Sequence, residues 1–594
     1  MNANKFMISI IPTYNTNFRT FGWVQDSSDL RSLCDVVAVF DANSKKHKDM
    51  INCIIPKLIE ERDGRNDFIN ALQKTPLKIE YAKLVGTSFS PRNKSRCNGI
   101  IQAAVKGQVR NFIGDWPADN YLRWAHCFGF IKYDYADDTF EITSRGLELA
   151  NARKIGQDLS KAEKELLINA VLTYSPAIRI LKLLSENEDT HLTKFEIGQQ
   201  LGFIGEDGFT SMPQKIFIRS LVNAQAKERK TMKANWEGSS DKYARMIAAW
   251  LEKLGLVEKI AKTITVINGE KEYTETIGQA YMITANGITA LRKAEGKSKH
   301  KRIAKNICWE MLSTKGKDRE YLRTRRAFIL KYLSENKKVV LVPDIINYLK
   351  TVNLNENKNT VLDDIKGLQN IGINISEKND GFLFDDEIND FIIPLPQSLT
   401  KSDLAETKEK IREKMSNLSH EYLALIDLAY DSKQNRLFEM KTLDLLTEEC
   451  GYQGLHLGGS RKPDGIIYTN SDKSKYGVII DTKAYSNGYN IPISQADEME
   501  RYIGENQTRN DKVNPNKWWE HFSDDINEFY FMFISGHFIG NFKSQIERIS
   551  RNKGVDGVAL AVENLLLCAE AYKSGRFTHE TIKNEMFKNK EFVF

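Results

Sequence analysis

The first half of the chain repeats one order of predicted elements: an amphipathic helix, a hairpin and a closing helix. Residues Leu122–Phe130 and Met246–Leu256 both show apolar side chains at helical spacing, and each segment reaches a glycine at its end. After the second of them, Asn268-Gly269 lies between two alternating segments. Asn-Gly in that setting is a type I′ turn signal and predicts a hairpin. A helix, a hairpin and a closing helix together form the second half of a winged helix.

The helices that open such a module are predicted as well. Thr193 is a suitable N-cap for a helix over Lys194–Leu201, which follows a helix ending with Ile180–Glu186. A near copy of that ending occurs at Ile329–Glu335, and Pro343–Leu349 then takes the position of the next helix. This internal repetition indicates several modules of the helix-turn-helix type.

We therefore predict three winged-helix/helix-turn-helix-like domains, over residues 1–155, 156–300 and 301–390. For any single copy, the alternative is a pair of amphipathic helices that only builds a core. The recurrence of the helices together with hairpins favours the modules over that alternative.

A different pattern begins after residue 400. Prolines at 394 and 396 predict a linker over 391–400, and strand-like segments alternate with helical ones across 401–594. The predicted strands are Gly465–Thr469, Tyr476–Ile480, Phe529–Ile534 and Gly557–Val562. This alternation predicts an α/β domain with a mixed sheet, so the whole chain is predicted to be a multidomain α+β protein.

Length and composition fit this division. A chain of 594 residues suggests about four domains. The net charge of +6 is compatible with a nucleic-acid partner and does not require one. The seven cysteines are scattered without a CxxC pair, which predicts reduced thiols and argues against structural zinc. No apolar run approaches the ~20 residues of a membrane span, so we expect a cytoplasmic protein without a membrane partner.

The predicted α/β domain contains one candidate catalytic set. Asp464 precedes one predicted strand, Asp481 follows the next, and Lys483 comes two residues later on the same strand face. Two carboxylates can hold Mg²⁺ against a phosphodiester and its attacking water, and an ammonium can stabilise the developing charge. Glu439 and Gln495 lie in flanking helical segments. Either residue could support the catalytic set, or it could be an ordinary core or surface residue.

By itself the pattern has modest specificity. Pro-Asp-Gly is a common turn, and Asp-x-Lys is common at solvated strand ends. The strand-turn-strand spacing and the adjoining apolar strands favour a nuclease. Arg461 and Lys462 add to this, because they precede the first acid where a DNA backbone would run.

Longer motifs carry a resemblance to a known family. At the nuclease end they are Gly451–Gly465 (GYQGLHLGGSRKPDG), Asp481–Tyr485 (DTKAY), Gln495–Met499 (QADEM) and Glu505–Arg509 (ENQTR). Upstream they are Thr20–Gln25, Leu84–Thr87, Leu122–His126, His191–Phe195 and Asn235–Met246. Over nearly the whole chain these runs resemble the FokI family of type IIS restriction endonucleases.

The resemblance implies an activity and a site. Asp464 and Asp481 would bind Mg²⁺ and Lys483 would be the catalytic lysine of a PD-(D/E)xK nuclease domain. Asp497 and Arg501 match a pair that bridges two nuclease domains in a transient homodimer; the alternative is a solvated ion pair within one helix. The expected partners are double-stranded DNA and, in the bacterial host, a protecting methyltransferase.

The resemblance also implies which residues read the DNA. Gln25, Arg92 and Trp116 match contacts of the first domain, and Glu237, Lys242 and Arg245 match contacts of the second. The family target is an asymmetric GGATG site. Asp26 and Ala234 stand where the family pattern has asparagine, and neither side chain offers the hydrogen bonds of an amide.

Two other functions stay open from sequence. One is a nuclease of the same catalytic class that cuts DNA by structure, in repair or junction resolution. The other is a DNA-binding regulator whose nuclease domain has decayed, against which the intact Asp464, Asp481 and Lys483 argue.

Overall fold

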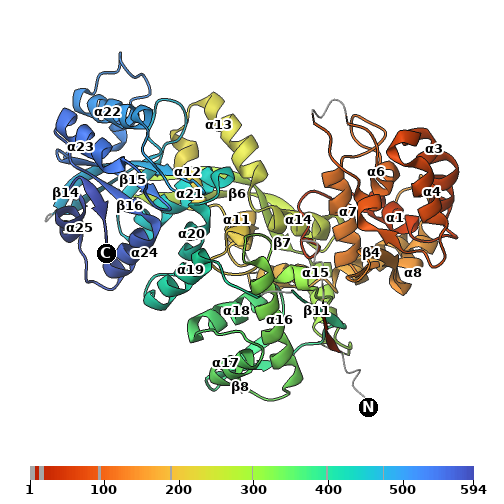
Figure 1. Cartoon of the computed structure of the whole chain (residues 1–594). Coiled ribbons are helices and arrows are strands. Elements are labelled where there is room, and N and C mark those ends of the chain that lie inside the picture. The colour runs from red at the N-terminus through yellow and green to blue at the C-terminus, as the bar shows by residue number, and fades with distance from the viewer. Residues whose placement is uncertain are drawn as a thin grey trace. The chain divides into compact units, whose positions relative to one another are not determined.

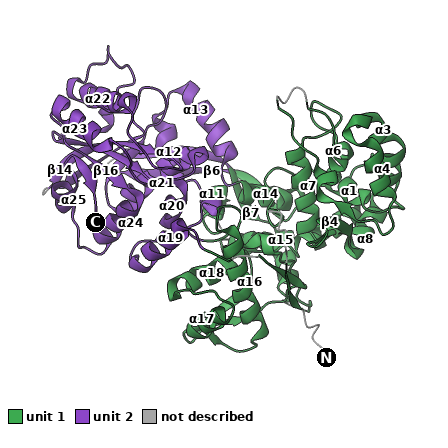
Figure 2. Cartoon of the chain, in the orientation of Figure 1, with its two compact units in different colours: residues 1–203, 242–260, 279–400 green, residues 204–241, 261–278, 401–594 purple. Residues whose placement is uncertain are grey.

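The structure is a computed structural model and forms two compact units (Figures 1 and 2). It describes residues 7–12, 19–90, 95–187, 190–269, 271–297, 299–396, 399–471 and 474–594. Unit 1 comprises residues 1–203, 242–260 and 279–400, and unit 2 comprises 204–241, 261–278 and 401–594. All seven cysteines are free thiols, as the sequence predicts.

Three small sheets share one topology in the first 400 residues. In each, a short first strand pairs with the second strand of a following hairpin, giving the orders β2-β4-β3, β5-β7-β6 and β8-β10-β9. The strands are β2 (Ile79–Glu80), β3 (Ile131–Asp134), β4 (Thr139–Ile142), β5 (Leu192–Thr193), β6 (Val257–Asn268), β7 (Lys271–Ile283), β8 (Val340–Leu341), β9 (Ile375–Lys378) and β10 (Gly381–Phe384). This recurrence agrees with the predicted internal repetition, while the winged-helix assignment of each module stays a prediction.

The predicted helices of these modules are present. They are α7 (Asp115–Cys127), α10 (Ser175–Ser185), α11 (Lys194–Gly198), α14 (Lys242–Lys253), α16 (Arg319–Glu335) and α17 (Val342–Thr351). Thr193 caps α11 in a capping box with Glu196, as its sequence position predicts. That helix ends at Gly198, three residues before the predicted end. Further helices of unit 1 are α1 (Leu30–Val39), α2 (Lys45–Asp49), α3 (Ile55–Leu58), α4 (Arg65–Gln73), α5 (Tyr81–Val85), α6 (Ile100–Ala104), α8 (Ser144–Ala152), α9 (Lys161–Val171), α15 (Ala285–Ala294) and α18 (Lys358–Asn370).

The hairpin predicted from Asn268-Gly269 forms, but its turn begins one residue later. Thr263 pairs with Thr276 and Thr265 with Thr274 through their hydroxyls, at 3.0 and 2.9 Å. This register keeps Asn268 in β6, and Gly269, with a φ of +62°, starts the turn.

Part of the segment predicted as a linker is a strand. Residues Phe391–Leu395 form β11, which pairs in parallel with β1 (Ile8–Pro12). The pairing joins segments nearly 400 positions apart in the sequence, so no local pattern could indicate it. Pro394 fits this two-stranded sheet because β11 has one neighbouring strand and the missing N–H can face away from it.

The segment 401–594 contains the predicted mixed sheet. Its order is β12-β13-β14-β15-β16-β17, antiparallel from β12 to β14 and parallel from β14 to β17. The strands are β12 (Gln453–His456), β13 (Gly465–Ser471), β14 (Ser474–Lys483), β15 (Phe529–Ser535), β16 (Gly557–Ala561) and β17 (Lys590–Phe592). The four predicted strands are the central ones, and the two short edge strands were not predicted.

Helices cover both faces of this sheet, because its central strands are apolar on both sides. On one face Phe531 and Phe533 pack with Met499 and Ile503 of α22 (Ile493–Thr508) and with Ile546 of α23 (Phe542–Lys553). On the other, Ile467, Val478, Met532 and Leu560 face α24 (Val562–Lys573) and α25 (His579–Met586). Unit 2 also contains α12 (Gln214–Asn223), α13 (Ala226–Met232), α19 (Asp403–Lys414), α20 (Ala424–Leu428) and α21 (Asn435–Asp444).

Candidate active site and nucleic-acid interface

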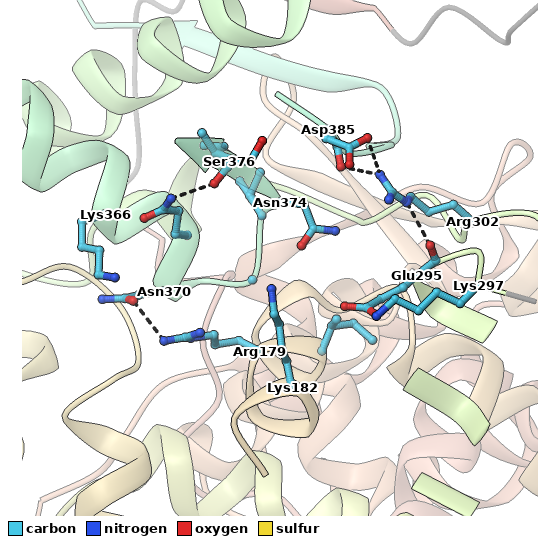
Figure 3. A pocket seen from close by; sticks show the side chains of 15 residues that line it. Arg179, Lys182, Glu295, Lys297, Arg302, Lys366, Asn370, Asn374, Ser376 and Asp385 are labelled. Atoms are coloured by element: carbon cyan, nitrogen blue, oxygen red, sulfur yellow. Dashed lines mark hydrogen bonds and ion pairs between the residues drawn. The ribbon is translucent and has the colours of Figure 1, made fainter. Parts of the chain in front are cut away.

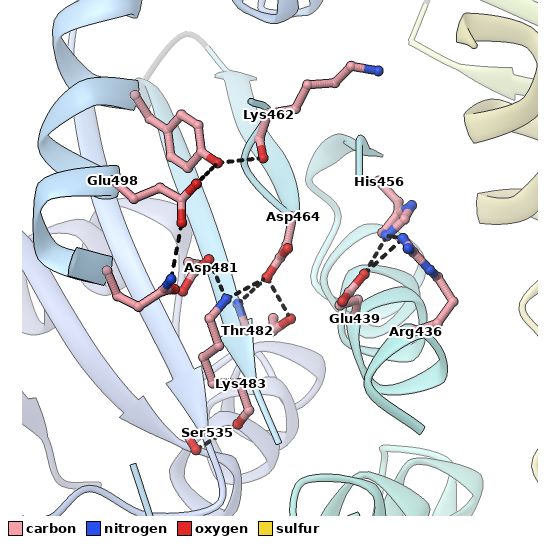
Figure 4. A network of polar contacts seen from close by, with 12 residues as sticks. Arg436, Glu439, His456, Lys462, Asp464, Asp481, Thr482, Lys483, Glu498 and Ser535 are labelled. Atoms are coloured by element: carbon pink, nitrogen blue, oxygen red, sulfur yellow. Dashed lines mark hydrogen bonds and ion pairs between the residues drawn. The ribbon is translucent and has the colours of Figure 1, made fainter. Parts of the chain in front are cut away.

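The register of β13 and β14 brings the two predicted metal-binding acids together. Gly465 pairs with Ile480, so Asp464, just before β13, lies beside Asp481 at the same end of the strand pair (Figure 4). The antiparallel pairing of the strands therefore makes neighbours of two carboxylates that are 17 positions apart in the sequence. This is the juxtaposition predicted from the two apolar strands.

Lys483 joins the acids. Its ammonium donates to Asp481 Oδ1 at 2.7 Å and lies 3.4 Å from Asp464 Oδ2. Because strand side chains alternate, the side chains of residues 481 and 483 project to the same face of β14. The three predicted catalytic side chains thus form one hydrogen-bonded cluster.

Thr482, which was not predicted as a site residue, holds Asp464 in place. Its backbone N–H donates to Asp464 Oδ2 at 2.8 Å, and its hydroxyl donates to the same oxygen at 3.2 Å. A backbone donor leaves no signature in a single sequence, because every residue except proline carries one. The position between Asp481 and Lys483 was the available clue.

The surroundings favour the neutral form of the Asp481 carboxyl and the charged form of the Lys483 ammonium. Burial, and then the neighbouring charge of Asp464, raises the pKa of Asp481 to about 7. Burial acts to lower the pKa of Lys483, but the charges of Asp481 and Asp464 outweigh it and raise that pKa well above its usual range. Lys483 is therefore an ammonium at neutral pH, whereas Asp481 needs a second positive charge to be fully ionised there.

The carboxylate oxygens suit a hard divalent cation. Asp481 Oδ2 is buried and has no hydrogen-bond partner, and the Asp464 side chain keeps one-fifth of its surface exposed. An unsatisfied buried carboxylate oxygen is costly unless a cation or a donor reaches it. Among the described residues no cluster of three or more His, Cys, Asp or Glu has metal-binding geometry, so a metal here would depend on these two acids and on oxygens from water or substrate.

The two flanking polar residues lie outside the catalytic cluster. Glu439 on α21 accepts from His456 Nε2 at 2.9 Å and from Arg436 at 3.1 Å (Figure 4). Burial opposes ionisation of Glu439, but these partners outweigh burial and lower its pKa. Gln495 donates to Glu498 at 3.1 Å, and the charge of Glu498 contributes to the raised pKa of Asp481.

The two basic residues before Asp464 have partners within unit 2. Lys462 forms an ion pair with Glu228 of α13 at 3.2 Å, and Arg461 donates to the Val513 carbonyl at 2.9 Å. In this structure the charge of Lys462 is thus engaged by a carboxylate of the same chain.

Two further contacts join α12 to the segment 401–594 in unit 2. Arg219 pairs with Glu448 at 3.1 Å, and the Ser220 hydroxyl donates to the His456 carbonyl at 3.1 Å. The side chains of Arg219 and His456 are almost fully buried in these contacts. The segment 401–594 is therefore packed against residues 204–241 in this structure.

The predicted dimer residues do not pair with each other within the chain. Asp497 accepts from Arg548 of α23 at 2.5 Å, and Arg501 pairs with Glu498 at 2.8 Å. Both remain partly accessible, with side-chain exposures of 62% for Asp497 and 41% for Arg501. The alternative of an intrahelical Asp497–Arg501 pair is therefore not what the structure has.

The predicted DNA-reading residues of the first module are tied together by a buried asparagine. Asn120 on α7 accepts from the Gln25 backbone N–H and donates to the Trp116 carbonyl, both at 2.9 Å. The Gln25 side-chain amide donates to the Tyr243 hydroxyl at 2.9 Å. Trp116 is 46% exposed. Arg92 lies outside the described residues.

The predicted contacts of the second module lie on two elements. Glu237 ends a short π-helix (Lys233–Glu237) and accepts from the Gly278 N–H at 3.3 Å. Lys242 is exposed and Arg245 half-buried on α14, off its buried stripe, as predicted. That stripe consists of Ala244, Met246, Ile247, Ala248, Trp250 and Leu251, so Tyr243 and Leu254 are less buried than predicted.

Four protein-family models match the chain. They are the FokI recognition domain subdomain 1 (19–152) and subdomain 2 (163–299), the FokI D3 domain (312–380) and the FokI cleavage domain (401–593). The chain is 44% identical over 585 residues to the type II restriction enzyme FokI of Planomicrobium okeanokoites, covering 98% of this chain and 100% of that protein. The chain belongs to the FokI family of type II restriction enzymes.

A second curated enzyme and two solved structures are also similar to this chain. The type II restriction enzyme StsI of Streptococcus sanguinis is 33% identical, with 98% of this chain and 97% of that protein covered. The structure of FokI matches with a TM-score of 0.90 at 45% identity, and the structure of FokI bound to DNA with 0.91 at 44%; both cover 97% of this chain and all of the other. The predicted resemblance and the multidomain fold are confirmed.

Asp26 and Ala234, the two positions where the resemblance led us to expect asparagine, are both exposed. Surface positions can change without disturbing the core, so these substitutions bear on what the surface contacts.

In the part of the chain that the structure describes, no helix combines the length and apolar content of a membrane crossing.

Proposed function

We propose that this FokI-family enzyme is of the type IIS class. It binds an asymmetric, GGATG-like site in double-stranded DNA and hydrolyses both strands at a fixed distance downstream, leaving 5′-phosphate ends. The observation that carries the proposal is the cluster of Asp464, Asp481 and Lys483, which lies within the segment similar to the FokI cleavage domain.

Recognition and cleavage belong to different parts of the chain in this proposal. Residues 1–155, 156–300 and 301–390 are recognition domains, and 401–594 is the cleavage domain. Gln25, Arg92, Trp116, Glu237, Lys242 and Arg245 contact the DNA. Arginine and lysine suit guanine edges, and glutamate can accept from a cytosine amine. The exposed Trp116 and Lys242 support this assignment, because base contacts need accessible side chains.

Hydrolysis follows from the charges of the cluster. Asp464 and Asp481 would hold Mg²⁺, which when bound lowers the pKa of a coordinated water and neutralises charge on the phosphate. Thr482 fixes the Asp464 carboxylate, so its position does not depend on the metal. Lys483, which remains protonated, donates to a non-bridging phosphate oxygen as negative charge grows there.

Double-strand cleavage requires two such sites. We propose that the cleavage domains of two molecules associate transiently, with Asp497 and Arg501 of one copy pairing reciprocally with those of the other across a two-fold axis. Their accessibility supports this role. A methyltransferase of the bacterial host would protect its own sites, and the enzyme would act in the cytoplasm, where the chromosome lies.

The test is to incubate the full-length protein with plasmid DNA and Mg²⁺ and to map the ends by sequencing. Ends at one constant offset from one asymmetric motif support the proposal. Ends that follow DNA structure would identify a repair or junction nuclease, and intact DNA would identify a regulator without nuclease activity.

A further inference from the structure

A cavity of about 410 Å³ opens in unit 1, and none of the residues proposed to read or cut DNA lines it. One wall is α10, a second is the segment that follows α15, and the third is the end of α18 with residues 371–374 and the start of β9 (Figure 3). Its volume is in the range of small-ligand sites. It is therefore large enough for a phosphorylated group.

Cations outnumber acids around this cavity. The lining contains the cations Arg179, Lys182, Lys297, Arg302 and Lys366 and the acids Glu295 and Asp385, a difference of three charges. Both acids are already engaged: Lys297 pairs with Glu295 at 2.6 Å, and Arg302 with Asp385 at 3.3 Å. The three remaining cations are thus left without a carboxylate in the lining.

Arg179 illustrates the missing counter-charge. Its guanidinium donates to two neutral oxygens, the Gln200 carbonyl at 3.2 Å and Asn370 Oδ1 at 3.3 Å. Burial lowers its pKa, and only a more remote acid, Glu186, acts in the other direction. A guanidinium held by neutral partners in a partly buried place gains most from an anion.

The two lysines converge on the same space. Lys182 projects from α10 into the cavity, and Lys366 projects from α18 toward Asn370 (Figure 3). Neither forms an ion pair within 4.0 Å with any acid among the described residues. The Asn374 side-chain amide adds a neutral donor on the opposite wall. Three cations and an amide around one space match the acceptor oxygens of a phosphate group.

We propose that this cavity is a binding site for an anionic phosphate group, held by Arg179, Lys182 and Lys366. The phosphate is supplied either by a DNA backbone or by a free phosphorylated small molecule. The site shares no residue with the cluster of Asp464 and Asp481, so phosphate binding needs neither the metal nor the nuclease reaction.

Calorimetric titration of the full-length protein with inorganic pyrophosphate, in EDTA and low salt, tests the site. The wild type should bind one pyrophosphate, and K182Q/K366Q should bind it about tenfold or more weakly, because two charge-assisted contacts are lost. K337Q/K338Q is the matched control, because it removes two exposed charges of unit 1 that do not line the cavity, and it should bind like the wild type. Equal melting temperatures would show that all three proteins are folded.

The source of the phosphate is distinguished with a long duplex that contains the recognition site. If a DNA backbone supplies it, the duplex displaces pyrophosphate, and K182Q/K366Q lowers the slope of log affinity against log salt by about two. If a free molecule supplies it, duplex and pyrophosphate bind together and the slope is unchanged. Absence of saturable pyrophosphate binding, or equal binding by wild type and K182Q/K366Q, would overturn the proposal.

Discussion

The backbone N–H of Thr482 donates to Asp464 Oδ2 at 2.8 Å, across the antiparallel pair β13 and β14. The strand that carries Asp481 and Lys483 therefore also fixes the acid of the other strand. A carboxylate oriented by a backbone donor keeps its position whether or not a cation is bound. The geometry of the site is thus a property of the sheet, and substitutions that leave the backbone intact should change it only in part.

Replacing Thr482 with valine tests the side-chain share of this support. The variant keeps the N–H bond and the β-branched shape but loses the hydroxyl that donates to Asp464 at 3.2 Å. Cleavage should fall about tenfold, since a hydrogen bond to a charged group contributes ~1.5–3 kcal/mol, while DNA affinity stays unchanged. Single-turnover cleavage rates measure the effect. Thr469→Val is the control and should cut at the wild-type rate. It removes a hydroxyl from the same sheet, on β13, which is hydrogen-bonded to His579 of α25.

Cleavage should depend on the ionisation of Asp481. Burial and Asp464 raise the pKa of Asp481 to about 7, and the protonated acid is a poor metal ligand. The rate at low Mg²⁺ should therefore rise with pH up to roughly pH 7–8. More Mg²⁺ should move the midpoint to lower pH, because the cation favours the carboxylate. A midpoint that does not respond to Mg²⁺ would argue against Asp481 as the ligand.

The same shift makes a prediction for stability. The folded chain holds the Asp481 proton up to about pH 7, whereas the unfolded chain releases it near pH ~4, so this group makes the fold less stable as pH rises between those values. In EDTA, the melting temperature of Asp481→Asn relative to wild type should increase from pH 4 to pH 7. A constant difference would contradict the raised pKa.

Charge reversal tests the proposed dimer contact. Arg501→Asp places two like charges opposite each other if residues 497 and 501 meet across a two-fold axis, so double-strand cutting should fall about tenfold at low enzyme concentration. Mixing Arg501→Asp with Asp497→Arg should restore it. Lys543→Glu reverses an exposed charge on the neighbouring helix α23 and should have little effect. Full double-strand cutting by Arg501→Asp alone would contradict the proposed dimer contact.

Tyr243 should influence DNA reading through Gln25. Tyr243→Phe removes the acceptor for the Gln25 amide, so affinity for the recognition site should fall about threefold to tenfold, with discrimination lost mainly at one base pair. In a Gln25→Ala background the same change should have no further effect. Tyr321→Phe, which loses a buried hydroxyl bond to Glu356, is the control and should bind normally. Equal losses in both backgrounds would show that Tyr243 acts independently of Gln25.

The sequence predicted those parts of the site that depend on strand ends and alternation. Asp464, Asp481 and Lys483 follow from two apolar strands and the period of two, and the structure brings them together. Thr482 could not be found in this way, because its main contribution is a backbone N–H. The connection of Gln25 to Tyr243 joins residues 218 positions apart, and periodicity contains no information on such a pairing.

The fold shows the same division between local and distant causes. Local signals predicted the hairpin after α14, yet its register depends on cross-strand threonine pairs and moved the turn to Gly269. Pro394 and Pro396 predicted a linker over this part of the chain. Residues 391–395 nevertheless form a strand, because they pair with β1. The strand at 391–395 depends on a distant pairing, whereas the position of the turn depends on the pairing of the two strands within the hairpin.

The most direct measurement compares binding and cutting by wild type and Asp481→Asn on one duplex that contains the recognition site. The substitution keeps the shape of the side chain and removes its charge. With Mg²⁺ present, we predict that both proteins bind the duplex with equal affinity and that only the wild type cuts it. Cutting by Asp481→Asn at a rate near that of the wild type would contradict the assignment of this cluster as the nuclease site.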